Sequence, residues 1–468
     1  MNDFDSDMAA GLLKKEGHEI VQDDDSADVI LFNTCSVRQH AEDRVLGQLA
    51  ELKGEKKKRP DLVIGVMGCM VENYKTKFFA DYPHVDILIG TRSIPELPKA
   101  IETVRTERRQ VLELAKTGFG YELLEMPRLE GKFHAYLPIM TGCDKVCSFC
   151  IVPYVRGREI SRPLREVADE VRRLAEIGVK HVTLLGQNVN SYGKTVASGE
   201  SVSADFATLL RAVSKVPGIE KIGFTTSHPE DASEELFQAI RDEEKISRRF
   251  HLPLQSGSDF ILERMKRDHT LAEYRKKIDR MRELIPDIAV TTDIIVGFPG
   301  ETDADYEATK KALADIQFDG AFIFKYSPRP HTAAARWEDS MPMDEKNRRN
   351  NELLNLQKEI TKRKNQTWLG RTVKVMVEDM SKKSREEVLA RTWQEKKVVF
   401  KGSGTLIGSS LRVRLEQVFD ETYRAEVVSI PPPPQADHSE RPAKTGASSS
   451  SERAGTKEFQ PEQAADRR

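Results

Sequence analysis

The chain has 468 residues, too many for one ordinary hydrophobic core, so its length predicts two or three domains. Charged residues make up 32% of the sequence and the formal net charge is −2, which excludes a strong overall attraction for nucleic acid; any such contact must come from local patches. No N-terminal run resembles a signal peptide and no apolar stretch could span a bilayer, so we expect a cytoplasmic protein without membrane contact.

Residues 1–105 alternate between helical and strand patterns. A helix is expected at 8–15, where Gly17 suits the left-handed residue that ends it. Continuous apolar runs predict buried strands at 29–32, 62–68 and 85–90, and a helix at 37–52 with Ser36 as its cap. The alternation predicts an open parallel α/β domain. Such domains usually begin with a strand, and that first strand is missing here.

Two of the five cysteines, Cys35 and Cys69, follow the first two of these strands. In open α/β sheets, ligands collect beyond the carboxyl ends of the strands. A free cysteine is often just a small buried hydrophobe. Because two cysteines occupy equivalent positions, we favour shared binding of a metal centre.

Residues 106–132 are charged and lack a pattern, which is typical of a linker. A strand-then-helix unit then recurs over a predicted domain at 133–342. The strands are expected at 135–140, 181–185, 221–225, 250–254, 289–296 and 320–326, and the helices at 165–177, 206–216, 234–241, 272–284 and 303–316. Six βα units in succession predict a parallel barrel or partial barrel, whose active site forms at the carboxyl ends of its strands.

The other three cysteines, Cys143, Cys147 and Cys150, share one loop directly after the first of these strands. Three thiolates are one short of a closed tetrahedral zinc site, and one short of the ligands of a cubane iron–sulfur cluster. Either a fourth ligand comes from elsewhere, or one metal position stays open for a substrate.

The spacing of these cysteines, with Phe149 before the last, resembles the radical SAM superfamily. More narrowly, the chain resembles the tRNA methylthiotransferases, and within them the branch that acts on N6-(dimethylallyl)adenosine. The resemblance covers roughly residues 1–430 and is carried by the segments 33–38, 68–69, 142–157, 184–190, 224–229, 251–259 and 293–302.

This resemblance implies a sulfur-transferring enzyme. Cys143, Cys147 and Cys150 would hold a [4Fe–4S] cluster whose open iron binds S-adenosyl-L-methionine, and the resulting radical would abstract hydrogen from C2 of the adenine at position 37 of tRNA. Cys35 and Cys69 would bind a second, auxiliary [4Fe–4S] cluster that carries the sulfur to be methylated and transferred. No side chain is expected to act as a classical acid or base, because the cofactors carry the chemistry.

The resemblance also suggests four residues of the S-adenosylmethionine pocket, namely Phe149, Gln187, Asn188 and Gln255. The alternative for Gln187 and Asn188 is that they cap turns or the next helix. The segment 297–301 would support the adenosine, or would simply form a tight turn.

The sequence departs from the family at its start. Relatives carry a third N-terminal cysteine at the end of the first strand, and neither that cysteine nor that strand is present. We expect that Met1 is an internal residue of a longer natural protein.

Other polar residues have a simpler interpretation. His134, His181 and His251 lie at strand starts, away from the cysteine loop, so we do not expect them to bind zinc. Arg264, Lys266 and Arg267 could contact phosphate, but a solvated helix face is the commoner role of such charges.

A charged helix at 343–365 is expected to lead into a small β domain at 366–430, with strands at 373–377, 387–391, 398–400, 411–415 and 425–428. This region has a net charge of +3 and resembles the TRAM module, a β-barrel that binds RNA. Trp393, Phe400 and Tyr423 are candidate stacking faces; the alternative is that the module is only a structural cap. The Pro- and Ser-rich tail at 431–468 is expected to be disordered.

The expected partners are the anticodon loop of tRNA around adenosine 37 and an electron donor of the flavodoxin or ferredoxin type, and we expect a monomer. If the protein is an enzyme, the alternative is a methylthiotransferase that acts on threonylcarbamoyl adenosine or on a ribosomal protein. If it is not an enzyme, the alternative is an RNA-binding protein with a closed, structural metal site.

Overall fold

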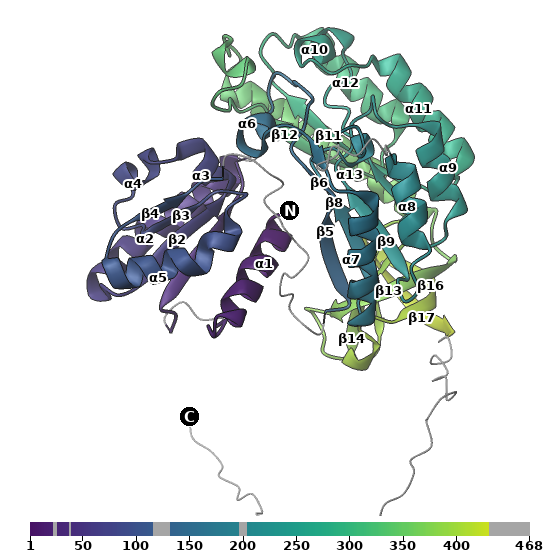
Figure 1. The fold of residues 1–468 in the computed structure, drawn as a ribbon. Helices are drawn as coiled ribbons and strands as arrows, with labels where there is room; N and C mark the ends of the chain where they lie inside the picture. Colours follow the sequence, from purple (N-terminus) through teal and green to yellow (C-terminus); the bar gives the residue numbers. More distant parts are fainter. Residues whose placement is uncertain (22–25, 37–38, 116–131, 196–203, 430–468) are drawn as a thin grey trace, which may run out of the picture. The chain divides into compact units, whose positions relative to one another are not determined.

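The computed structural model describes residues 1–21, 26–36, 39–115, 132–195 and 204–429, which form three regions of regular structure (Figure 1). Most of the predicted linker and the predicted disordered tail lie outside the described residues. None of the described helices is both long and apolar enough to cross a membrane.

The N-terminal region is an open parallel sheet with helices on both faces, as predicted. Its four strands lie in the order β1-β2-β3-β4, each parallel to the next. The strands are β1 (Val29–Thr34), β2 (Val63–Gly68), β3 (Ile87–Ile89) and β4 (Val111–Glu113). The helices are α1 (Asn2–Lys15), α2 (Gln39–Lys58), α3 (Cys69–Tyr74), α4 (Lys77–Asp81) and α5 (Leu97–Glu107).

Two apolar cores sandwich this sheet, because side chains alternate between its faces. Met67 of β2 belongs to a core with residues of α1 and α5, such as Met8 and Ile101. Val66, the next residue back along β2, belongs to a second core with Leu49 of α2. The first helix begins earlier than the sequence predicted, and β4 adds a strand within the segment interpreted as linker.

The central region contains six parallel strands with helices between them. The principal strands are β5 (His134–Pro138), β8 (His181–Leu185), β9 (Lys221–Thr225), β10 (Arg249–His251), β11 (Ala289–Val296) and β12 (Gly320–Lys325); β6 (Met140–Thr141) and β7 (Ile160–Ser161) form a small antiparallel pair. The helices are α6 (Val152–Arg156), α7 (Leu164–Glu176), α8 (Phe206–Ser214), α9 (Glu234–Asp242), α10 (Asp259–Arg264), α11 (Leu271–Leu284) and α12 (Asp303–Ile316).

These strands form two three-stranded parallel sheets, β5-β8-β9 and β10-β11-β12. A parallel bridge between Ile222 of β9 and Ile246, just before β10, links the two sheets. The longer helices lie on the outside of the curved surface, as Figure 1 shows for α7, α8, α9 and α11. This arrangement fits the predicted partial barrel of six βα units.

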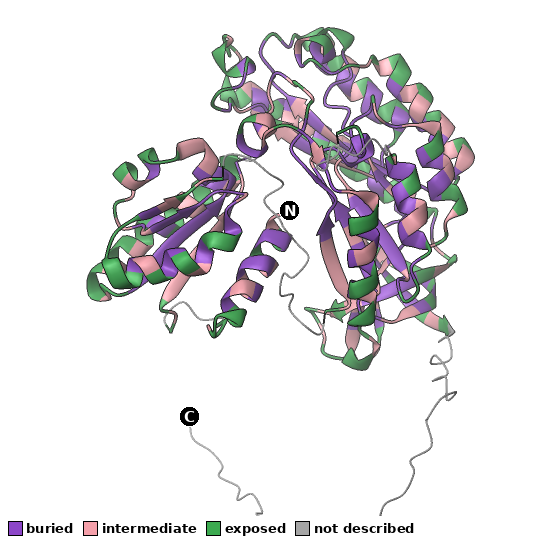
Figure 2. Ribbon diagram, viewed as in Figure 1, coloured by how far each residue is buried: buried purple, intermediate pink, exposed green. Residues whose placement is uncertain are grey.

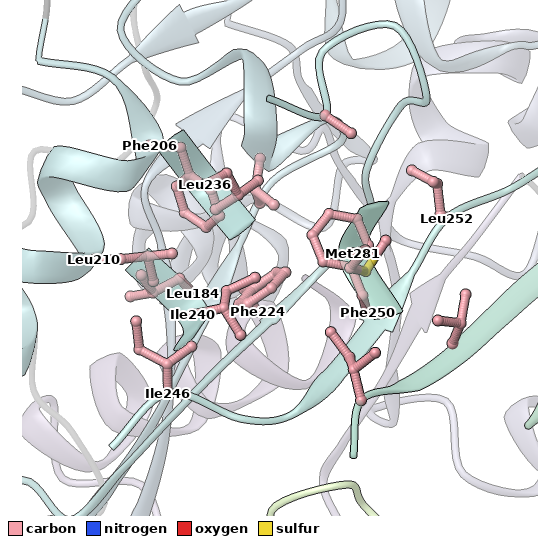
Figure 3. Packing of buried hydrophobic residues seen from close by; sticks show 14 of the residues in the cluster. Leu184, Phe206, Leu210, Phe224, Leu236, Ile240, Ile246, Phe250, Leu252 and Met281 are labelled. Atoms are coloured by element: carbon pink, nitrogen blue, oxygen red, sulfur yellow. The ribbon is translucent and has the colours of Figure 1, made fainter. Parts of the chain in front are cut away.

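One apolar core fills the space between the strands and the helices. Its members include Phe224, Phe250, Leu184 and Met281, which point toward one another in Figure 3. Figure 2 shows the same layering, with buried strands inside and exposed residues on the outer sides of the helices. The strand β10 is shorter than predicted. Pro253 has no amide hydrogen to donate, and the amide of Leu254 donates to the side chain of Thr292 at 2.9 Å.

The C-terminal region begins with the long helix α13 (Met343–Gln366), which packs on β11 and β12. A closed five-stranded barrel follows, in the order β13-β14-β15-β17-β16. Its strands are β13 (Thr372–Met380), β14 (Glu387–Thr392), β15 (Lys397–Lys401), β16 (Ser410–Phe419) and β17 (Thr422–Ser429).

The loop between β14 and β15 contacts the amino ends of the central strands. Lys221, at the start of β9, is fully buried and donates to the carbonyl of Thr392 at 3.2 Å. Its ammonium also pairs with Glu395 at 2.6 Å. The carbonyl of Trp393 accepts bonds from the amide of Arg248 and the hydroxyl of Ser247. The small barrel is therefore attached at the end of the central strands opposite the cysteine loop.

The expectation that three aromatic residues of the small barrel stack on RNA is wrong. Phe400 and Tyr423 are interior residues of this barrel, exposed by only 2% and 0%. Trp393 is also buried, and the ammonium groups of Lys221 and Lys374 lie over its ring. All three side chains stabilise the fold and offer no free face.

We expect Phe250→Ala to lower the free energy of unfolding by about 3–5 kcal/mol, because it leaves a cavity in the central core. The ring packs edge-to-face against Phe224 and Phe237, at centroid distances of 5.6 and 6.0 Å. Urea denaturation followed by fluorescence would measure the loss. Phe322→Ala is the matched control, since that ring is 46% exposed; equal losses for the two variants would contradict the assignment of the core.

Candidate functional site

The loops that follow the central strands gather the unusual polar residues at one end of the barrel. The cysteine loop follows β5 and β6, the segment 186–190 follows β8, and 226–229 follows β9. Residues 252–258 and 297–301 follow β10 and β11. Because parallel strands share one direction, these five segments meet at the carboxyl end, where barrels of this kind build their active sites.

The cysteine loop begins with a glycine that no other residue could replace without movement. Gly142 has a φ of +77°, and a Cβ atom there would overlap the carbonyl oxygen of Arg158. Its amide donates to Oε1 of Gln187 at 2.6 Å. The amide of Cys143 donates to the carbonyl of Gly157 at 3.2 Å. The first cysteine is therefore held by backbone contacts to the chain that returns after α6.

Ser148 fastens the middle of the loop to two distant segments. Its amide donates to the carbonyl of Met265 at 3.0 Å, and its hydroxyl donates to the carbonyl of Arg264 at 2.8 Å. Its own carbonyl accepts the amide of Ala334 at 2.8 Å. Three hydrogen bonds from one residue fix the loop between Cys147 and Cys150.

Cys143 is buried, and Cys147 and Cys150 are half-buried. Burial raises the pKa of Cys143 to about 11 and that of Cys150 to about 12, and the nearby Cys147 adds to both shifts. A thiol that is hard to ionise alone becomes a thiolate when a metal replaces its proton. The donor set is three cysteines of one loop, which fits a cubane cluster with one position open.

Of the four residues predicted for the S-adenosylmethionine pocket, Phe149 belongs to this loop and Gln187 contacts it, whereas Asn188 and Gln255 lie in the segments after β8 and β10. Phe149 packs edge-to-face on Phe298, at 6.3 Å between ring centroids. The side-chain oxygen of Gln187 accepts the amide hydrogen of Gly142 and so stabilises the start of the loop. Asn188 donates to Asp231 at 2.7 Å, and Gln255 adopts a φ of +73°.

Several buried polar atoms at this end of the barrel have no partner within the described residues. They are Oδ1 of Asn188, Oγ of Ser227, Nε2 of His228 and Oε1 of Gln255. Such atoms are costly to bury alone. Thr226 also has a positive φ, +71°, and strained residues of this kind cluster at ligand sites. The setting therefore fits a bound polar molecule beside the thiolates.

A nearby acidic group does not resemble a metal site. The ligand atoms of His228, Glu230 and Asp231 lie within 4.8 Å of one another. However, Lys145 pairs with both carboxylates and Lys194 pairs with Asp231. The lysines already neutralise these charges, so the group is best described as an ion-pair network.

Glu159 is a residue of this site that the sequence did not single out. Its side chain is 4% exposed, and one oxygen accepts a hydrogen bond of 2.6 Å from the hydroxyl of Ser191. Burial raises the pKa of Glu159 to about 7, so its carboxyl can hold a proton near neutral pH. Its position two residues after Gly157, which contacts the cysteine loop, is the only sequence signal for it.

The other two cysteines lie together at the carboxyl ends of β1 and β2, as predicted from their positions. Thr34 and Gly68 are paired across these strands, and Cys35 and Cys69 each follow directly. Cys69 is buried. Cys35 is half-buried and lines a pocket together with residues that include Asn33, His40 and Arg44.

A short helix connects the two groups of cysteines. The helix α6 starts two residues after Cys150 and packs against α3, which begins with Cys69. Cys69, Ile151 and Val155 form one apolar cluster. At the end of α6, the buried Arg156 pairs with the buried Asp5 at 3.2 Å. Burial raises the pKa of Cys69, and the charge and hydrogen bond of Arg156 oppose that rise.

His134 and His181 begin β5 and β8, as expected, whereas His251 is the last residue of β10 and does not lie at a strand start. His134 and His181 stack with ring centroids 4.1 Å apart, and His134 shares a hydrogen bond of 2.9 Å with Thr183. His251 contacts Thr291 and Asp293.

The expectation of a solvated face is wrong for two of the three basic residues near α10, since Arg267 is buried and Arg264 is half-buried. Arg267 is 7% exposed and reaches the cysteine loop, where its guanidinium lies 3.4 Å from the sulfur of Cys147. Arg264 lies over the ring of Trp337 and donates to the carbonyl of Pro299. Only Lys266 remains exposed.

Two protein-family models match the chain. The model described as the radical SAM superfamily matches residues 137–313, the central barrel with its cysteine loop. The model described as uncharacterized protein family UPF0004 matches residues 1–90, the N-terminal sheet with Cys35 and Cys69.

Solved structures of radical SAM enzymes share the fold. A radical S-adenosylmethionine methyltransferase, TsrM from Kitasatospora setae, solved with tryptophan and an S-adenosylmethionine analogue, aligns with a TM-score of 0.51 and 17% identity over 71% of this chain and 72% of that one. The same enzyme solved with cobalamin and a [4Fe–4S] cluster aligns with a TM-score of 0.50 and 16% identity over 71% and 74% of the two chains. At this identity the likeness concerns the fold. The central region is thus of the radical SAM class.

Curated relatives narrow this class to one family. A tRNA-2-methylthio-N(6)-dimethylallyladenosine synthase of Clostridium novyi is 42% identical over 92% of this chain and 94% of its own length. The enzymes of the same name from Neisseria meningitidis serogroup A and Acetivibrio thermocellus are 41% and 42% identical over 92% of this chain, and over 97% and 89% of their own lengths. The chain belongs to the family of tRNA-2-methylthio-N6-dimethylallyladenosine synthases.

We expect Gly142→Ala to reduce the iron incorporated on reconstitution several-fold, because the added Cβ would push Arg158 away and displace Cys143. Iron and sulfide analysis of the purified variant would measure this. Gly47→Ala, on α2, is the control, since a Cβ there meets no atom within 4 Å. Full iron content in Gly142→Ala would show that the loop does not depend on this conformation.

The paired histidines predict a loss of stability in mild acid. Burial, with a smaller effect of Lys221, lowers the pKa of His134 from 6.5 to about 4. The unfolded chain therefore binds more protons below pH 6.5, and lowering the pH from 7 to 5 should reduce the free energy of unfolding by at most about 2 kcal/mol from this residue. Denaturation midpoints at the two pH values would test this. The difference should shrink in His134→Gln and persist in His331→Gln, whose ring is exposed.

Proposed function

We propose that this chain converts N6-(dimethylallyl)adenosine at position 37 of tRNA to its 2-methylthio derivative. The observation that carries the proposal is the three-cysteine loop at the carboxyl end of the barrel, in a chain 42% identical to a synthase of that name over nearly its whole length. The unpartnered polar atoms around the loop support a polar cosubstrate at the same place.

Cys143, Cys147 and Cys150 would hold a [4Fe–4S] cluster, with S-adenosylmethionine on its open iron. Together, the cluster and S-adenosylmethionine would supply the radical chemistry, which starts with reductive cleavage of S-adenosylmethionine. The chain itself positions them. Ser148 fixes the loop, Gln187 supports its first turn, and Asn188 and Gln255 offer unpartnered oxygen atoms toward a bound ligand.

Cys35 and Cys69 would be two ligands of the auxiliary cluster that provides sulfur, whose third cysteine is missing from this sequence. Their adjacent positions at the ends of β1 and β2 support this assignment. The positive charge of Arg156 beside Cys69 favours the thiolate form, which a metal requires.

The small C-terminal barrel would bind tRNA outside the anticodon loop, through its net charge of +3 and not through buried aromatic rings. The target nucleoside, adenosine 37, would enter at the cysteine loop. A flavodoxin- or ferredoxin-type protein would supply electrons, and the enzyme would work as a monomer in the cytoplasm, where tRNA is modified.

Complementation tests this reaction. In a bacterial strain that lacks its own synthase, expression of the chain should restore 2-methylthio-N6-dimethylallyladenosine, measured by mass analysis of digested tRNA. Cys147→Ala should leave the unmethylthiolated nucleoside, because the loop loses one thiolate. Unchanged nucleosides with the intact chain, together with a new methylthio group on a threonylcarbamoyl adenosine or a ribosomal protein, would contradict the proposal.

Iron analysis tests the two sites separately. The reconstituted chain should hold about eight iron atoms, from two cubane clusters. The triple variant Cys143→Ala, Cys147→Ala, Cys150→Ala and the double variant Cys35→Ala, Cys69→Ala should each retain about half of that iron. Iron content that is unaffected by the double variant would contradict an auxiliary cluster at Cys35 and Cys69.

A further inference from the structure

Arg267 lies in a segment that is tied closely to the cysteine loop. The chain turns sharply after α10, where Lys266 has a φ of +52°, and the amide of Arg267 donates to the carbonyl of Leu262 at 2.9 Å. The residues just before it supply the carbonyls that hold Ser148. This turn aims the side chain of Arg267 inward, at the loop.

The guanidinium group spans two structural elements. One terminal nitrogen, Nη1, donates to the sulfur of Cys147 at 3.4 Å. The other, Nη2, donates to the carbonyl of Pro253 at 2.9 Å, in the segment after β10. The third, Nε, is buried and has no partner within the described residues. The group is rigid and planar, so these contacts leave little freedom of position.

The charge of Arg267 is buried without a carboxylate. The side chain is 7% exposed, and no described aspartate or glutamate forms an ion pair with it. A buried unpaired charge is strongly destabilising, so a cation in this place calls for a negative partner. The sulfur of Cys147, 3.4 Å away, would supply that negative charge when a metal replaces its proton.

We propose that Arg267 is a positioning residue that sets the reduction potential of the cluster at the cysteine loop. This inference rests on the proposed assignment of that cluster to Cys143, Cys147 and Cys150. One-electron reduction by a low-potential protein donor adds one negative charge to the cluster and its thiolates. A hydrogen bond to a cluster sulfur and a nearby positive charge both stabilise the reduced form, so they raise the potential.

Arg267→Gln removes the charge and the contact to Cys147, and should shift the midpoint potential to more negative values. The potential would be measured by redox titration followed by electron paramagnetic resonance. The background is the full-length double variant Cys35→Ala, Cys69→Ala, so that only one cluster contributes. Lys266→Gln is the matched control, because it removes the same charge from the neighbouring exposed residue and should leave the potential unchanged.

Arg267→Lys separates the effect of the positive charge from the effect of the contact to Cys147. It also provides a second variant in case Arg267→Gln does not fold. It keeps the positive charge but cannot span Cys147 and Pro253 with one planar group, so its potential should lie between those of the wild type and Arg267→Gln. A purely structural role would lower the iron content and leave the potential of the remaining clusters unchanged, and this result would overturn the proposal. Loss of the cluster from both variants would also overturn it, since Arg267 would then be required for assembly.

The same experiment distinguishes a cysteine loop without a cluster from a cluster whose potential does not depend on Arg267. If the cysteine loop does not hold a cluster, the background variant with intact Arg267 will show no resonance signal at all. If the loop holds the cluster but Arg267 does not tune it, the signal will appear with the same potential in every variant.

Discussion

The interaction on which the site depends is the set of backbone hydrogen bonds that fixes the cysteine loop. Ser148 alone bonds to the turn after α10 and to the segment before Trp337, so one loop residue joins parts of the chain that lie more than 100 residues apart. These bonds are possible only because the barrel brings the carboxyl ends of its strands to one edge. The positions of the sulfur atoms are consequently set by the whole barrel and not by the loop sequence alone.

Much of this architecture could be predicted from the sequence, because parallel strands that are buried on both faces consist of continuous apolar residues. The strands β8, β9 and β11 occupy the predicted residues. The strand β10 was predicted too long. Pro253, which cannot donate a ladder hydrogen bond, was a usable signal, whereas the bond from Leu254 to the side chain of Thr292 was not visible in the sequence. Because the strands could be located from their apolar runs, both groups of cysteines could be placed at strand ends.

The residues that could not be predicted are those whose role depends on which way a side chain faces. Phe400 was a candidate for RNA stacking by composition, yet it alternates with Lys397 and Lys401 in a barrel strand and faces inward beside Val398. That alternation was a usable signal. Arg267 and Glu159 offered none of comparable strength, because their burial arises from segments distant in sequence. Charged residues in loops are mostly exposed, so the general rule predicts the wrong environment for both.

The helix α6 connects the two cysteine groups, because it follows Cys150 and packs with Cys69. Its five residues span about 7.5 Å at the usual rise of 1.5 Å per residue, with the cysteine loop at one end and Arg156, beside Cys69, at the other. Its contacts with α3 lie within the same apolar cluster as Cys69. Any transfer between the two groups would therefore cross a packed interface that forms as the chain folds.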